Sequence, residues 1–351
     1  MNSLLKEITI FIPTRNRPHF LNRLLRYYQE VQFPGSLFIG DASDPDFVKQ
    51  NRKICEAFQN DLEIRFFETP EVSTHQSIEA MAAEAETRYA TSVCDDDFLC
   101  LEGLAECAAF LDQNSDYVGA HGKGLMFSIH GGGAHGQIHY SQFYPQAVIE
   151  EERPVDRLKS YFEKGGAVVF TLYRTADWKK MFQNPQKISR YQITFIFGEL
   201  VNASVAVIRG KIKELDCLYL LRQVHAKQKM AELDIYKWFV HPEWYATYQF
   251  LSECIVGELY SKSGLNSDEA YDLFEKTFGS YLVGVFRKYF PLQFEKKKSA
   301  TILKKISNRL YRFRKDHVGK DPMALTQLLH PKSPYYNSFK PFYQVITGGS
   351  A

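Results

Sequence analysis

The chain has 351 residues, of which 45% are hydrophobic and 15% aromatic, and its formal net charge is +2. This composition indicates a folded protein with one large or two modest cores and excludes a disordered chain. No apolar run reaches the roughly 18 residues that cross a bilayer, and the amino terminus lacks a signal-peptide pattern, so we expect a cytoplasmic protein. The six cysteines show no zinc or disulfide spacing, so neither structural zinc nor disulfides are expected.

Residues 1–100 alternate between short apolar runs and helix-type segments. Strands are predicted at 8–13, 36–40, 62–67 and 89–94. Helices are predicted at 20–31, 47–58 and 72–86. This alternation indicates a parallel α/β sheet, in which ligands lie beyond the carboxyl ends of the strands. Three polar clusters fall at that edge, at residues 14–17, 41–44 and 95–97.

The most informative cluster is the acidic triplet Asp95, Asp96 and Asp97, which follows an uncharged β-prone run. Three adjacent carboxylates repel one another and cannot be buried without a counter-charge. Oxygen-rich sites of this kind suit Mg²⁺ or Mn²⁺, which leave coordination positions open for substrate phosphates. The alternative is an acidic turn that caps the following helix, because Asp is a good N-cap.

Three motifs together resemble the nucleotide-binding half of family 2 glycosyltransferases, over about residues 7–125. They are Thr-Ile-Phe-Ile-Pro-Thr-Arg-Asn-Arg-Pro at 9–18, Gly-Asp-Ala-Ser-Asp at 40–44 and Cys-Asp-Asp-Asp-Phe-Leu at 94–99. The resemblance implies a GT-A fold: a Rossmann-like, nucleotide-sugar-binding α/β domain with a mixed sheet flanked by helices. One departure is Ala42, where the family usually has glycine, which allows a tighter turn. The resemblance therefore does not indicate which nucleotide base is preferred.

The resemblance also implies roles for individual residues. In the family the first turn lines the base pocket, the second supplies an acid to the base, and the Asp-x-Asp motif contacts ribose and metal. Asp97 would therefore hold Mn²⁺ or Mg²⁺. The implied nucleotide-sugar-binding residues are Pro13, Thr14, Arg15, Asn16, Arg17, Asp41, Asp95, Asp96 and Arg222.

Residues 126–230 resemble the acceptor side of such an enzyme. A helix from residue 155, a β-rich run at 167–173 and a short helix at 178–182 are predicted. Glu199 is at the position that resembles the family's general base. One alternative is that Glu199 is only a surface residue of a helix. Another is that Asp156 or Asp177 is the base.

The run at 218–225 begins as an apolar strand and turns polar. It resembles the closing strand of the GT-A core, in which Arg222 would bind phosphate and His225 would complete the metal shell; a surface histidine is the alternative. The glycine-rich segment at 130–136 predicts a mobile hairpin or lid, because it lacks the ending of a phosphate loop. His121 is interpreted as structural.

The region 231–351 is predicted to be helical, with helices at 244–260 and 268–289. Between Arg287 and Lys320 twelve basic residues face two acidic ones, a local charge of +10. Within this block, residues 296–316 form a basic amphipathic pattern. That pattern predicts either peripheral binding to the anionic inner face of the plasma membrane or packing on the catalytic domain. No motif for reading nucleic acid is present.

These observations lead to one functional hypothesis with two alternatives. The hypothesis is a metal-dependent, inverting glycosyltransferase that moves a sugar from a nucleotide-sugar donor to a hydroxyl of a glycan or lipid-linked glycan. Residues 1–230 would form the GT-A catalytic domain, with a nucleotide-binding half at 1–125 and an acceptor-side half at 126–230. Residues 231–351 would form a helical region. Surface polysaccharide synthesis is the expected setting. The first alternative is a nucleotidyl or sugar-phosphate transferase, and the second is a non-catalytic glycan-binding or scaffold protein.

Overall fold

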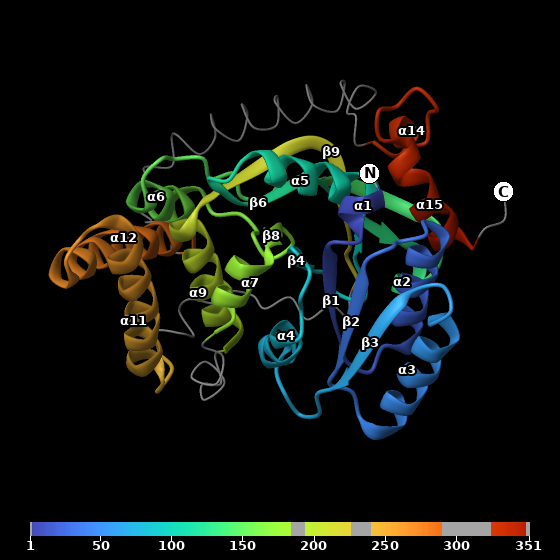
Figure 1. Cartoon of the computed structure of the whole chain (residues 1–351), viewed down its shortest axis with the longest axis horizontal. Coiled ribbons are helices and arrows are strands. Elements are labelled where there is room, and N and C mark those ends of the chain that lie inside the picture. The colour runs from blue at the N-terminus through green and yellow to red at the C-terminus, as the bar shows by residue number, and fades with distance from the viewer. Residues whose placement is uncertain (1, 184–193, 226–239, 290–323, 349–351) are drawn as a thin grey trace, which may run out of the picture.

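The computed structural model describes residues 2–183, 194–225, 240–289 and 324–348. Within these residues nine strands form one mixed sheet in the order β3-β2-β1-β4-β8-β6-β9-β5, with β7 paired to β6 (Figure 1). The strands are β1 Ile8–Thr14, β2 Ser36–Asp41, β3 Glu63–Glu68, β4 Tyr89–Ser92, β5 Phe98–Leu99, β6 Tyr117–Ile129, β7 Ile138–Tyr144, β8 Leu172–Arg174 and β9 Lys211–Gln223.

Helices cover both faces of this sheet (Figure 1). Those of the first half are α1 Asn2–Leu5, α2 Pro18–Glu30, α3 Pro45–Phe58, α4 Thr74–Ala83, α5 Leu101–Gln113 and the short 3₁₀ helix η1 His130–Gly132. Those of the second half are α6 Pro154–Lys164, α7 Thr175–Met181, α9 Thr194–Arg209, α11 Trp244–Ser263, α12 Ser267–Tyr289, α14 Leu325–Leu328 and α15 Tyr336–Thr347.

The elements predicted for residues 1–100 are all present, with small shifts at their ends. Strands β3, β2, β1 and β4 are parallel neighbours, and Thr14 at the end of β1 is in register with Asp41 at the end of β2. Farther along the sheet, β8 pairs antiparallel with both β4 and β6. The mixed α/β fold class is therefore confirmed, and the parallel part carries the loops expected to form the site.

Successive side chains of β1 point to opposite faces of the sheet and so pack into two different hydrophobic cores. Ile8, Ile10 and Ile12 face one core, which includes side chains of α2, α3, α5 and α15, whereas Phe11 faces the other. The second core includes side chains of α4, α6, α7, α9, α11 and α12. Because successive strand residues point to opposite faces, an uninterrupted apolar run fits a strand that is covered on both sides.

Helix α4 begins with a capping box. Ser73 Oγ accepts a hydrogen bond from the Gln76 amide, and the Gln76 side chain accepts one from the Ser73 amide. We expect Ser73→Ala to lower the free energy of unfolding by about 1 kcal/mol, since it leaves an amide of the first turn without its acceptor. Urea denaturation measures this loss, and Thr74→Ala, at the next and exposed position, should change stability much less.

One prediction in the second half needs correction: the run 167–173 forms a strand only at its end, in β8. The glycine-rich run after Tyr117 forms one continuous strand, β6. Its glycines allow close neighbours: a Cβ at Gly122 would lie 2.4 Å from the Cys217 carbonyl oxygen, and one at Gly124 would lie 2.7 Å from that of Tyr144. The glycines therefore serve close packing of β6 instead of breaking it.

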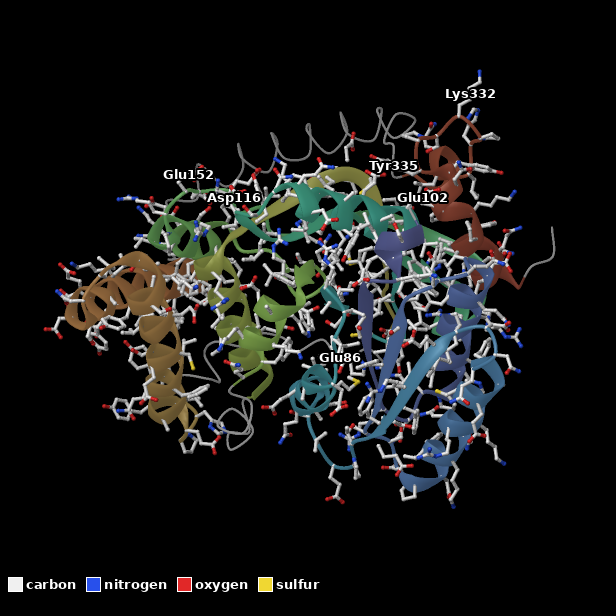
Figure 2. All side chains as sticks on the ribbon, viewed as in Figure 1. Glu86, Glu102, Asp116, Glu152, Lys332 and Tyr335 are labelled. Atoms are coloured by element: carbon white, nitrogen blue, oxygen red, sulfur yellow. The ribbon has the colours of Figure 1, made fainter. Side chains whose placement is uncertain are left out.

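The last helix, α15, returns to the first half of the chain. Phe342 is fully buried and packs edge-on against Phe98 and Phe127. At the start of α15, Tyr335 donates a hydrogen bond to Asp216, and Ser338 bonds to Glu102 of α5; Tyr335 and Glu102 are labelled in Figure 2. This helix supports β5, the strand that directly follows the acidic triplet.

The predicted helices at 244–260 and 268–289 are confirmed as α11 and α12. The basic segment 296–316 lies outside the described residues. Among the helices that are described, none combines the length and the apolar character needed to cross a membrane.

Candidate active site

Hydrogen bonds join the three polar loops at the carboxyl edge of the sheet. Thr14 Oγ1 donates to Asp95 Oδ2 over 2.7 Å, which links the loop after β1 to the acidic triplet. The Asn16 amide donates to Ser43 Oγ over 2.7 Å, and the Asn16 side chain exchanges hydrogen bonds with Asp44. The three clusters that the sequence placed at this edge therefore lie in contact with one another.

The turn after β2 keeps its shape without glycine. Ala42 does not adopt a left-handed backbone conformation, and its amide bonds to the Thr14 carbonyl over 3.0 Å. In this pair of loops the left-handed residue is Asn16, with φ of 56°, a conformation that Asn tolerates better than most residues. Ala42, where family 2 glycosyltransferases usually have glycine, therefore causes no backbone strain.

Asp41 is fully buried and has internal partners. Its Oδ1 accepts from the Ser43 amide and its Oδ2 from the Asn51 side chain, each over 2.9 Å. Asp41 thus fixes the turn after β2, and its contact with a base stays a prediction. Pro13 is half-buried at the end of β1, and Arg15 is exposed beside it.

The acidic triplet is buried, and Arg17 and His225 contact it. Asp95, Asp96 and Asp97 are at most 2% exposed. Arg17 Nη1 contacts Asp95 Oδ1 at 3.1 Å and Asp96 Oδ2 at 2.9 Å, and His225 Nε2 lies 2.9 Å from Asp96 Oδ2. The helix-cap alternative is wrong, because the N-cap of α5 is Cys100, which makes no side-chain capping bond.

The three carboxyl groups differ in acidity. Burial and the charge of Asp96 raise the pKa of Asp95 to about 6, against the opposing effect of Arg17. Burial also acts to raise the pKa of Asp96, but the hydrogen bond from His225 and the charge of Arg17 bring it below its usual range. Burial and the charge of Asp96 hold the pKa of Asp97 well above its usual range.

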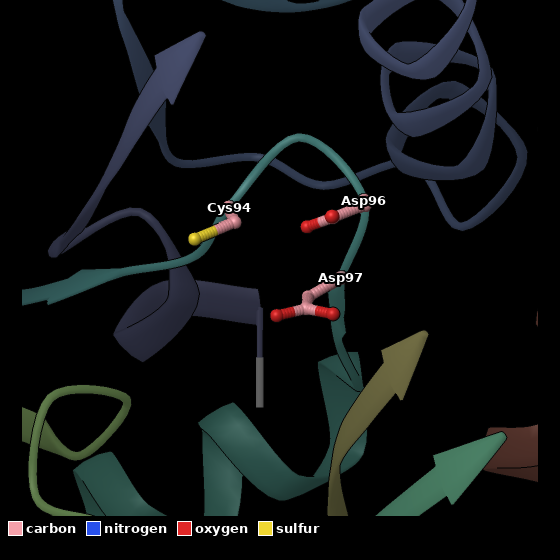
Figure 3. Close-up of side chains that lie close together, drawn as sticks. All are labelled: Cys94, Asp96 and Asp97. Atoms are coloured by element: carbon pink, nitrogen blue, oxygen red, sulfur yellow. The ribbon is translucent and has the colours of Figure 1, made fainter. Parts of the chain in front are cut away.

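Asp97 uses one of its two carboxylate oxygens in a hydrogen bond: its Oδ1 accepts from the Gln223 amide over 2.9 Å. Among the described residues its buried Oδ2 has no hydrogen-bond donor, and Arg222 Nε is 3.9 Å away. One potential ligand atom each from Cys94, Asp96 and Asp97 lies within 4.8 Å of the others, and Figure 3 shows this group. An orphaned buried oxygen within such a cluster fits a divalent cation.

His225 lies beside this cluster and not in it. Its ring stacks on Phe20 at 5.2 Å, and its Nε2 contacts Asp96. The structure thus brings His225 to the acidic triplet as the sequence predicted, although its role as a metal ligand stays a prediction.

Arg222 lies near Asp97, and its charge also acts on Glu199. Arg222 bonds to the Tyr144 hydroxyl and stacks over the rings of Tyr144 and Phe170. Glu199 is solvent-accessible on α9. Desolvation of the carboxyl group by neighbouring atoms raises the pKa of Glu199, and the charge of Arg222 opposes this rise.

The two alternative bases are held elsewhere. Asp177 pairs with Arg209 at 2.7 Å, and Asp156 pairs with Arg153 at the exposed start of α6. His121 is buried, with both ring nitrogens within 3.0 Å of a backbone carbonyl, which confirms its structural interpretation.

Arg23 is a site residue that the sequence analysis missed. It is fully buried on α2 and donates to the carbonyls of Asp96 and Ala134 and to the Gln223 side chain. Burial lowers its pKa to about 10, against the raising effect of the three aspartates. The available signal was a single charge among apolar neighbours on the buried face of α2.

The glycine-rich segment 130–136 is anchored by these contacts. The Ala134 carbonyl accepts from Arg23, the Gly133 carbonyl accepts from the Gln223 side chain, and the Gly136 amide bonds to Ile346 of α15. The predicted hairpin is confirmed by the antiparallel pairing of β6 and β7. The segment between these strands is held in place by its hydrogen bonds to Arg23, Gln223 and Ile346, so it does not match the predicted mobile lid.

We expect Arg23→Ala to lower the free energy of unfolding by about 3 to 5 kcal/mol, because it leaves buried acceptors without donors beside three carboxylates. Arg26→Ala is the matched control, since Arg26 is exposed on the same helix and should change stability by less than about 0.5 kcal/mol. Urea denaturation of both variants measures the difference. Equal midpoints for the two variants would show that Arg23 does not support the acidic loop.

Comparison with known proteins relates part of this chain to a curated protein. No protein-family model matches this chain. The poly(ribitol-phosphate) beta-N-acetylglucosaminyltransferase TarS of Staphylococcus aureus is 24% identical over an alignment of 177 residues that covers 48% of this chain and 28% of TarS. The alignment thus covers less than a third of that relative.

The fold is shared with TarS over most of this chain. The crystal structure of TarS 1-349 in complex with UDP-GlcNAc matches with a TM-score of 0.52 and 16% identity over 83% of this chain and 77% of that one. The complex with UDP matches with a TM-score of 0.51 and 16% identity over 83% and 76%. A further TarS crystal structure matches with 0.51 and 18% identity over 83% of this chain and 46% of its own. The chain therefore has the mixed α/β fold of TarS.

Proposed function

We propose that this protein is a glycosyltransferase that uses a nucleotide-sugar donor, with a UDP-sugar as the first candidate. The observation that carries the proposal is the buried Asp97 Oδ2, which has no hydrogen-bond donor among the described residues, in an acidic loop that hydrogen bonds join to the other loops at the carboxyl edge of the sheet. The shared fold adds support, because TarS has been crystallised with UDP-GlcNAc and with UDP. A family 2 assignment rests on the sequence motifs.

Asp97, with Asp96 beside it, would hold Mn²⁺ or Mg²⁺, and such a cation neutralises the charge that develops on a departing nucleoside diphosphate. Arg222 sits within reach of the same region and would bind phosphate oxygens. Arg17 forms ion pairs with both Asp95 and Asp96, so its proposed role is to hold those two carboxylates close together.

Glu199 is the proposed base that accepts the proton of the acceptor hydroxyl as that oxygen attacks the sugar carbon. A carboxylate with a raised pKa suits this role, because it is a stronger base than an ordinary glutamate. Direct attack on the face opposite the leaving group would invert the sugar configuration. The proposed acceptor is a glycan or lipid-linked glycan, in surface polysaccharide synthesis at the inner face of the plasma membrane.

Analysis of products separates this proposal from its alternatives. The protein is incubated with Mn²⁺ and either UDP-sugars or nucleoside triphosphates plus sugar phosphates. Release of UDP from one UDP-sugar, even slowly to water, supports a glycosyltransferase, whereas release of pyrophosphate supports a nucleotidyltransferase. No release from any donor, together with glycan binding, supports the non-catalytic alternative.

A further inference from the structure

We propose that Cys94 is a thiolate ligand of the divalent cation at Asp97, so that the site selects thiophilic cations over Mg²⁺. This inference rests on the proposed cation site and names the chemistry of that site more closely. Two independent observations carry it: the Cys94 sulfur lies within 4.8 Å of ligand oxygens of Asp96 and Asp97, and Asp97 Oδ2 has no hydrogen-bond donor among the described residues.

The placement follows from the local sequence. Cys94 directly precedes the triplet, and the backbone turns here so that the Asp97 amide bonds to the Cys94 carbonyl over 3.0 Å. This turn returns the chain toward Cys94 and brings its sulfur within 4.8 Å of ligand oxygens of Asp96 and Asp97 (Figure 3). Atoms at such separations can bind one cation after small side-chain movements.

The accessibility of Cys94 agrees with this role. Cys94 is exposed to solvent, whereas Cys55, Cys100, Cys107 and Cys217 are buried. Asp97, in contrast, is 1% exposed, with its Oδ2 unpartnered. A cation bound by Cys94 would also reach the buried Asp97 Oδ2, for which the described part of the chain supplies no hydrogen-bond donor.

The chemistry of the donor set predicts selectivity. Binding replaces the Cys94 S–H proton by the cation, and the proton leaves to the buffer. Sulfur is a soft ligand that Mg²⁺ binds poorly, so affinity should rise from Mg²⁺ through Mn²⁺ to Co²⁺ and Zn²⁺. With oxygen ligands alone, the preference for Co²⁺ over Mg²⁺ would be smaller.

Cobalt absorbance tests the proposal without requiring turnover. The full-length protein is titrated with Co²⁺ under anaerobic conditions, and wild type should show a thiolate-to-cobalt charge-transfer band in the near ultraviolet. Cys94→Ser should lose the band and bind Co²⁺ about tenfold or more weakly, while its weak Mg²⁺ affinity changes little. Cys254→Ser, which alters a partly exposed cysteine on α11, should keep both the band and the affinity.

The outcomes are separable. Stoichiometric Co²⁺ binding by calorimetry without a charge-transfer band in wild type would overturn the role of Cys94 and leave the cation site intact. A band that persists in Cys94→Ser would also overturn it. Absence of Co²⁺ binding would overturn the cation site itself, and UDP release from UDP-sugars, measured in parallel, would then report separately on the glycosyltransferase proposal.

Discussion

Asp97→Asn should abolish cation-dependent nucleotide binding and lower sugar transfer by about 10³-fold, since several kcal/mol of charge stabilisation depend on this carboxylate. The amide keeps the shape of the side chain, and its oxygen can still accept from the Gln223 amide. The loss would therefore report on the charge of Oδ2 and not on a collapsed loop. Calorimetry with UDP and Mn²⁺, together with initial rates of transfer, measures it.

The fold of this variant should survive. Burial and the charge of Asp96 already raise the pKa of Asp97, so an uncharged side chain relieves repulsion in the metal-free protein. Its melting temperature without metal should equal or exceed that of wild type. Asp46→Asn, at an exposed position on α3, is the control and should retain full activity. A variant at position 97 with wild-type Mn²⁺-dependent binding would contradict the assigned cation site.

Glu199→Gln should lower kcat by about 10² to 10⁴, the usual contribution of a general base. The base must be ionised, and its pKa is raised above the ordinary glutamate value. Wild-type kcat/KM should therefore fall as the pH falls through that raised pKa, and the acid limb should lie above about pH 4.3, the midpoint for an ordinary glutamate. In the glutamine variant the limb should change shape, because what remains then reports only on Asp95 and Asp97, whose pKa values are also raised; a pH series of initial rates reveals the change.

The competing assignments supply the control for Glu199. Asp156→Asn should keep both the rate and the acid limb, because Asp156 lies on the surface and pairs with Arg153. Full activity in Glu199→Gln, or an unchanged acid limb, would show that Glu199 is not the base. Asp177 would then be the remaining candidate.

The parallel part of the sheet was predictable because its signals are local. The apolar run of β1 and the amphipathic pattern of α2 lie in short windows, and the rule that ligands bind at the carboxyl edge places Thr14, Asp41 and Asp95 together. The structure puts these loops in contact by hydrogen bonds such as that from Thr14 to Asp95.

The support behind the acidic triplet could not be read from local pattern. Arg23 contacts Gln223 across a separation of 200 residues, and His225 contacts Asp96 across 129. Such pairs depend on the final topology, which periodicity does not encode. The return of α15 to pack Phe342 against Phe98 is of the same kind, because an apolar helix gives no sign of which face it will cover.

The most direct test of the central claim is thermal stability in the presence of UDP, GDP, CMP or dTDP, each with Mn²⁺ and with EDTA. A ligand that binds only the folded state raises the melting temperature, by an amount set by its concentration relative to Kd. We predict an upward shift with UDP that requires Mn²⁺ and is lost in Asp97→Asn. Absence of a shift with every nucleotide, with metal present, would contradict a nucleotide-sugar site at Asp97.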